Sequence, residues 1–167
     1  ALYTNTGNNN TALGYKAATA VTTATNVVAV GDNAYLAGTT GGQTVAVGTN
    51  ALLSNTTGSY NVAVGQQALN SNTTASNNTA VGYQAAYSAT TASDITAIGW
   101  QAGYSATGTA STYIGSYAGQ TTTGINNTFL GHTSGYLVTS GTRNTIIGKY
   151  NGNQGGLDIR TSSNNIV

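Results

Sequence analysis

A short motif of apolar, strand-forming positions closed by a glycine recurs along almost the whole chain. One clear copy covers residues 78–85 and has the sequence Asn-Thr-Ala-Val-Gly-Tyr-Gln-Ala. Successive closing glycines are 16 or 17 residues apart, and they are Gly14, Gly31, Gly48, Gly65, Gly82, Gly99, Gly115, Gly131 and Gly148. A fixed period of this kind predicts stacked repeats, because each repeat completes its core only against its neighbours. Positions are numbered below from the closing glycine, so that −1 precedes it and +1 follows it.

The three positions before the glycine predict a β-strand that is apolar on both faces. Position −3 holds Thr or Val, and position −1 holds Leu, Val or Ile, which favours strand. Position −2 holds Ala in the first six copies and Tyr113, Phe129 and Ile146 in the last three. Because strand side chains alternate, position −2 faces away from its two neighbours. A solenoid interior covers one face only, so either the −2 row or the −1 row is expected to lie outside, covered by another copy of the chain.

The residues after the glycine predict a second short strand and a turn. An alanine recurs at +3, and a strand starting there is expected to carry Leu36, Leu52, Leu69 or Tyr87 inward. Thr-Thr pairs such as Thr56-Thr57 mark the turn back. Asparagines near the start of the first strand are expected to form ladders about 4.8 Å apart along the axis, and they are Asn10, Asn26, Asn61, Asn78, Asn127 and Asn144.

The pattern as a whole predicts an all-β fold. We expect a parallel β-solenoid, or β-roll, of about nine 17-residue coils over residues 1–154, with the chain starting in mid-coil. Residues 155–167 depart from the repeat and are expected to be an exit segment that leads to a further domain.

Composition narrows the classes of function. Only 4% of residues are charged and the net charge is +1, against about 25% charged residues in ordinary soluble domains. No basic stripe is present to neutralise phosphates, so nucleic acid is not an expected partner. No apolar run reaches the roughly 20 residues of a membrane span, so no membrane insertion is expected in this segment.

The chain offers little for catalysis. Asp32, Asp94 and Asp158 are far apart in the sequence, and His132 occupies position +1, which holds Tyr, Asp, Thr, Gln, Trp, Ser or Lys in the other copies. No catalytic residue, metal site or cofactor is therefore expected, and the protein is not expected to be an enzyme. Glycan cleavage needs a pair of carboxyl groups, which these separated aspartates do not predict.

Aromatic residues gather in the C-terminal half, where a strand would meet the following turn. Aromatic rings flanked by Gln and Asn can bind sugars by stacking and hydrogen bonding, and they can equally pack coil on coil. The candidates for glycan contact are Tyr83, Tyr87, Trp100, Tyr104, Tyr117 and Tyr136.

The unit Asn-Thr-Ala-Val-Gly-Tyr-Gln-Ala, with the turn Asn72-Thr73-Thr74, resembles repeats in phage and prophage tail-fibre proteins. Those repeats often precede an intramolecular chaperone of the endosialidase type, and residues 155–167 are similar to the segment that leads to it. The unit is also similar to the parallel β-roll head of trimeric autotransporter adhesins, whose repeat is shorter. The resemblance implies a homotrimer outside the cell, on a virion or bacterial surface. It also implies a fibre shaft or adhesive head, with a host-surface glycan or protein receptor as the expected contact.

An ice-binding β-solenoid is the alternative that the stacked threonines suggest. Ice-binding faces need outward threonines at alternate positions of one flat strand. Thr56 and Thr57 are adjacent, so only one of them can face a given surface.

Overall fold

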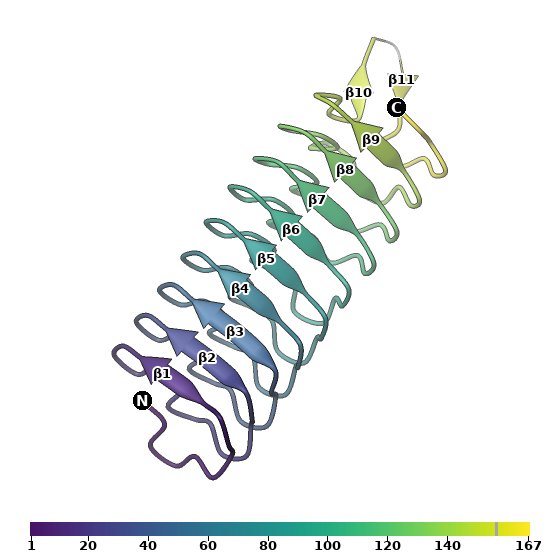
Figure 1. The fold of residues 1–167 in the computed structure, drawn as a ribbon. Coiled ribbons are helices and arrows are strands. Elements are labelled where there is room, and N and C mark those ends of the chain that lie inside the picture. Colours follow the sequence, from purple (N-terminus) through teal and green to yellow (C-terminus); the bar gives the residue numbers. More distant parts are fainter. Residues whose placement is uncertain (156) are drawn as a thin grey trace.

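The computed structural model describes residues 1–155 and 157–167, and it confirms the parallel β-solenoid with one coil per repeat. Nine strands lie side by side in one parallel sheet, in the order of the sequence (Figure 1). They are β1 (Thr11–Leu13), β2 (Val27–Val30), β3 (Thr44–Val47), β4 (Val62–Val64), β5 (Thr79–Val81), β6 (Thr96–Ile98), β7 (Thr112–Ile114), β8 (Thr128–Leu130) and β9 (Thr145–Ile147). Each pairs in register with the next, as Ala63 does with Ala80. No helix occurs among the described residues.

The −2 row fills the interior of the solenoid. Ala63 and Ala80 are fully buried, and so are the larger Tyr113, Phe129 and Ile146 of the last three coils. Positions −3 and −1 therefore face outward, which decides between the two alternatives that the alternating pattern left open.

Large and small residues at positions −2 and +4 compensate for one another in filling the interior of the coils. In three of the six copies with Ala at −2, position +4 carries a bulky buried residue, and these residues are Tyr35, Leu52 and Leu69. Where position −2 is Tyr113, a Cβ added at Gly119, which holds position +4, would lie 2.2 Å from the ring. Phe129 and Gly135 form the same kind of pair, at 2.4 Å. A close-packed interior requires this compensation, since it leaves no room for two large groups.

The predicted second strand is wrong, because the residues after each glycine form turns. Backbone φ is positive at +2 and +4, with 60° at Gln67 and 49° at Leu69, which an extended strand excludes. Leu52 and Leu69 do point inward, whereas Leu36 and Tyr87, at +5, are only half-buried. The main-chain N–H and C=O groups of the turns still form hydrogen bonds between successive coils. The Leu69 N–H, for example, donates to the Ala85 carbonyl at 3.0 Å. Strand geometry is thus not needed to pair these groups.

The asparagine ladder is confirmed at position −4. Asn61 Oδ1 accepts a hydrogen bond from the Asn78 N–H at 3.0 Å, and Asn61 Nδ2 donates to the Ala75 carbonyl at 2.8 Å. Each such side chain joins two main-chain groups of the next coil, and the residues that do so are Asn10, Asn61, Asn78, Asn127 and Asn144. Asn26 lies outside this row, because it occupies position −5, has φ of 57° and is exposed. It pairs along the axis in another row, where its Oδ1 accepts a hydrogen bond from Asn9 Nδ2 at 3.2 Å.

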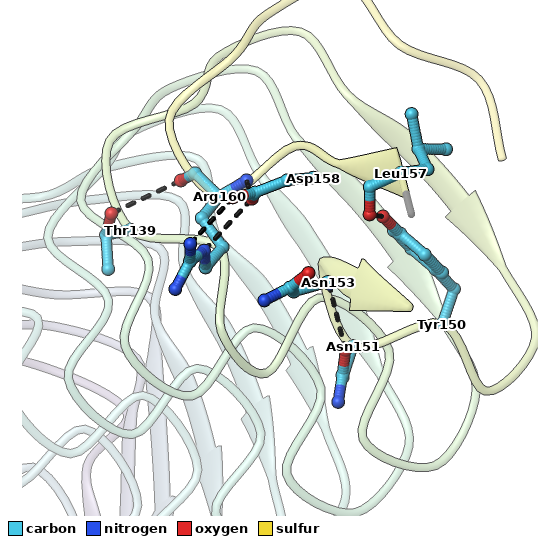
Figure 2. A network of polar contacts seen from close by, with 7 residues as sticks. All are labelled: Thr139, Tyr150, Asn151, Asn153, Leu157, Asp158 and Arg160. Carbon is cyan, nitrogen blue, oxygen red and sulfur yellow. Dashed lines mark hydrogen bonds and ion pairs between the residues drawn. The ribbon is translucent and has the colours of Figure 1, made fainter. Parts of the chain in front are cut away.

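A hairpin of β10 (Asn153–Gln154) and β11 (Leu157–Asp158) interrupts the repeat near the C-terminus. Figure 2 shows Tyr150 Oη donating to the Leu157 carbonyl at 2.6 Å, and Arg160 paired with Asp158. That pairing lowers the pKa of Asp158 to about 2.

Beyond the hairpin the chain returns to the stack. Thr139 Oγ1 donates to the Arg160 carbonyl at 3.2 Å (Figure 2). Asn165 N–H donates to Asn144 Oδ1 at 3.0 Å, as the N–H of the next coil does along the rest of the asparagine ladder. Residues 159–167 thus lie against the ninth coil, and their expected continuation into a further domain stays a prediction.

The closing glycines allow successive coils to approach. Gly65 has φ of 135°, and a Cβ there would lie 2.4 Å from the Gly82 carbonyl oxygen. The same close approach recurs from Gly14 to Gly131, at 2.4 to 2.7 Å. Glycine is needed here both for the φ angle and for the space.

We expect Gly65→Ala to destabilise the protein more than Gly148→Ala does. Gly148 also has a positive φ, 111°, but an added Cβ would meet nothing within 4 Å. The backbone conformation alone costs about 1–3 kcal/mol, so Gly148→Ala is the matched control, and the clash adds to this cost in Gly65→Ala. The measurement is the free energy of unfolding from urea titrations, and equal losses in the two variants would contradict the steric role.

Candidate functional site

The described residues hold no cluster of side chains that could bind a metal ion. No group of three His, Cys, Asp or Glu side chains lies together in this part of the chain, and no pocket opens on its surface. His132 is exposed on its turn. A search of the same residues finds no helix that could cross a membrane. The surfaces left for function are the outer side of the sheet and the turns that follow the strands.

The outer side of the sheet, called the strand face below, consists of the −3 and −1 side chains of β1–β9. The −1 row is partly exposed along its length, with Val81 at 36%, Ile98 at 38% and Leu130 at 43%. Position −3 contributes valines in β2–β4 and threonines in β1 and β5–β9. Neither row contains a charged residue. Because the nine strands lie side by side along the axis (Figure 1), the strand face is a continuous, largely apolar stripe.

In Thr-Thr turns, the hydroxyl of the first threonine can bond to the main chain of the next coil. Thr39 Oγ1 donates to the Thr56 carbonyl at 3.0 Å, and Thr56 Oγ1 donates to the Thr73 carbonyl at the same distance. In the pairs that begin at Thr39, Thr56 and Thr73 only the second threonine is exposed, whereas Thr90 and Thr91 are both exposed. The turns therefore offer one row of exposed threonines, which is less than a two-row ice-binding surface needs.

The six aromatic candidates for glycan contact form three pairs on neighbouring coils. Tyr83 stacks on Trp100 with ring centroids 4.3 Å apart, and Tyr87 stacks on Tyr104 at 5.1 Å. Tyr117 and Tyr136 meet edge to face at 6.3 Å. Coil-on-coil packing of these rings is thus confirmed, and glycan contact stays a prediction. We call this set the aromatic ridge, and its members are Tyr83, Tyr87, Trp100, Tyr104, Tyr117 and Tyr136.

A glutamine ladder that sequence reasoning missed runs along the aromatic ridge. Gln84 Nε2 donates to Gln67 Oε1 at 2.8 Å, and Gln101 Nε2 donates to Gln84 Oε1 at 2.7 Å. The ladder continues through Gln120, whose Nε2 donates to Gln101 Oε1 at 3.0 Å. Gln at +2 in three successive copies was the available signal.

The ladder also shows which turn positions are neighbours. Gln101 occupies +2 of its coil and Gln120 occupies +5 of the next, and Tyr117 and Tyr136 form the same combination. Asn70, at +5, likewise donates to the main chain of Asn50, at +2 of the preceding coil, at 3.1 Å. Amides and aromatic rings of successive coils therefore lie on one continuous surface.

Two interior tyrosines were not predicted as functional residues, and both resist ionisation. Burial raises the pKa of Tyr35 to about 12, although the hydrogen bond from Asn55 lowers it in part. Burial likewise raises the pKa of Tyr113 to about 12. The Tyr35 hydroxyl donates to the Gly41 carbonyl, whereas the Tyr113 hydroxyl has no hydrogen-bond partner among the described residues. These two tyrosine side chains pack the interior of the solenoid.

The chain matches no protein-family model, no curated protein and no solved structure. The resemblance to tail-fibre and adhesin repeats therefore rests on the sequence motif alone and stays a prediction.

We expect the protein to lose stability between pH 10 and 12. Tyr35 and Tyr113 stay neutral in the fold up to a pKa of about 12, whereas an unfolded chain begins to release these protons near pH 10. Stability is therefore complete below pH 10 and falls as the pH rises, by up to about 3 kcal/mol per tyrosine. Thermal unfolding followed by circular dichroism measures the effect.

Tyr113→Phe separates this effect from general alkaline damage. The variant should be at least as stable as the parent at pH 7, because it removes an unpaired buried hydroxyl. It should also lose less stability at pH 11. Tyr60→Phe, at an exposed position, is the control, and identical pH profiles for all three proteins would refute the role of Tyr113.

Proposed function

We propose that this chain is a non-enzymatic structural segment of an extracellular fibre, on a virion or a bacterial surface, which assembles as a homotrimer through the strand face. The observation that carries the proposal is the uncharged stripe of outward apolar side chains on nine stacked strands. The repeat motif and its resemblance to tail-fibre and adhesin repeats support the same assignment.

The size and shape of the strand face support association with copies of the same chain. Nine coils about 4.8 Å apart give a stripe roughly 40 Å long and several hundred Å² in area, which is the size at which exposed apolar surface indicates an interface. The stripe repeats from coil to coil, so parallel copies can pair along their whole length. Three such stripes around one axis bury one another and close the assembly, which prevents sideways growth.

The surface chemistry supports a shaft role in place of catalysis. The strand face has no charged group to desolvate on association. The side chains of the asparagine and threonine ladders form hydrogen bonds between successive coils, so these repeated polar residues stabilise the fold. In this proposal, the turns are the part of the protein that contacts a host-surface glycan or receptor.

The mass of the native protein in dilute buffer tests the trimer. We expect three times the chain mass of 16.7 kDa by sedimentation equilibrium. Val64→Lys, in the middle of the strand face, should weaken association by at least about tenfold, because like charges meeting across an interface are costly. Circular dichroism should show that the coil fold remains.

Thr57→Lys is the matched control, because it adds the same charge at an exposed turn outside the strand face. Its mass should equal that of the parent protein. A parent protein that is monomeric at micromolar concentration, or a trimer unaffected by Val64→Lys, would overturn the proposed interface.

Ice binding is a second candidate, favoured by one observation on the strand face. Five consecutive strands, β5–β9, carry an outward threonine at −3 beside an aliphatic residue at −1, in register along the sheet. Ice binding needs this face open to water, whereas the trimer covers it. Thermal hysteresis shown by a monomer and abolished by Thr112→Lys would establish ice binding and remove the trimer.

A further inference from the structure

Trp100 holds an exposed aromatic surface at the centre of the aromatic ridge. It is the sole tryptophan of the chain. One face of its ring stacks on Tyr83 at 4.3 Å, yet the residue remains 50% exposed. The next coil carries the small Ser116 at the same position, +1. The indole face away from Tyr83 therefore has only a small side chain as its neighbour along the axis.

The spacing of the coils leaves room beside this indole face. Equivalent positions of successive coils are about 4.8 Å apart, so the +1 positions of Trp100 and His132, two coils away, are about 10 Å apart along the axis. Ser116 lies between them. A gap of this length accommodates one flat ring stacked on the indole.

Amide groups of the glutamine ladder follow directly after Trp100 in the chain. Gln101 follows Trp100 in the chain, and Gln120 donates to it from the next coil at 3.0 Å. An amide group has two N–H donors and two acceptor lone pairs. Gln101 uses one N–H toward Gln84 and one lone pair toward Gln120. The ladder thus holds the amides in place and leaves hydrogen-bonding capacity free on each.

We propose that Trp100, Gln101, Ser116 and Gln120, the tryptophan platform, bind a neutral hexopyranose unit of a surface polysaccharide. The apolar C–H face of the sugar stacks on the indole, and its hydroxyls bond to the two amides and to the serine hydroxyl. None of the four side chains is charged, so the platform offers no ion-pair partner to a carboxylate or a sulfate group. Position and chemistry together select a neutral sugar.

The platform is separate from the strand face. It belongs to the turns that project past the ends of the strands, whereas the trimer would cover the flat side of the sheet (Figure 1). Sugar binding therefore deepens the proposed function, on which it rests for its surface ligand, and does not depend on the oligomeric state.

Fluorescence of the sole tryptophan tests the proposal on the intact chain. The protein is titrated with lactose, cellotetraose and maltotetraose, and with sialyllactose as the acidic comparison. We expect at least one neutral sugar to shift the emission to shorter wavelength and to protect Trp100 from quenching by acrylamide. Sialyllactose should bind more weakly than lactose.

Variants identify the site by capture on the same sugars immobilised on beads. Trp100→Ala should lower the affinity at least about tenfold, and Gln101→Ala should lower it severalfold. Position +1 holds Asp, Thr, Gln, Ser or Lys in other coils, so the fold accepts loss of the ring. Tyr60→Ala removes an exposed aromatic residue elsewhere and is the control.

Three results would overturn the platform. They are no emission change with any neutral sugar, tighter binding of sialyllactose than of lactose, or equal capture by Trp100→Ala and the parent protein. The sedimentation mass is measured on the same samples, so failure of sugar binding is distinguished from failure of the fibre assembly.

Discussion

The structure depends on one constraint, which is the regular main-chain hydrogen bonding of each coil to the next. Strands satisfy it by parallel pairing, and the turns satisfy it although their φ angles alternate in sign. The coils can approach this closely because the closing glycines carry no Cβ, as at Gly65 against Gly82. A Cβ at Gly65 would lie 2.4 Å from the Gly82 carbonyl oxygen, so the two coils would have to move apart at the expense of hydrogen bonds between them. The repeat period is therefore a requirement of the main chain.

The role of each side chain in this stack depends on the direction in which it points. Those that point inward fill a narrow space, so that a large Tyr113 is matched by Gly119 and a small Ala63 by a leucine. Those along the axis connect coils, as Asn61 does through both atoms of its amide. Those that point outward are free to vary, and position +1 carries nearly every class of residue. On such a fold, we expect functional surfaces where outward side chains form a pattern that the stacking of the coils does not require.

Two outward surfaces meet that criterion, and they are chemically different. The strand face is largely apolar and carries no charge over its whole length, which suits association with an identical surface. The aromatic ridge is local and mixed, with rings and amides held by contacts between coils. A fibre built in this way would separate assembly on one side from recognition at the turns, so that changes at Trp100 would leave the packing of the strand face unaffected.

The sequence alone determined the repeat, the strand at positions −3 to −1 and the fact that both of its faces are apolar, because strand periodicity is local and is repeated nine times. It could not decide which row lies inside, since alanines and valines are both acceptable core residues. The tertiary structure decided this through volume, because the interior is too narrow for a valine row opposite Leu52 or Leu69. The sequence also led to a second strand after the glycine, because alternating φ signs at residues such as Gln67 and Leu69 have no signature in side-chain pattern. The contacts between Trp100 and Tyr83 and along the glutamine ladder depend on the stacking of coils 16 or 17 residues apart. Only the folded structure brings these side chains together.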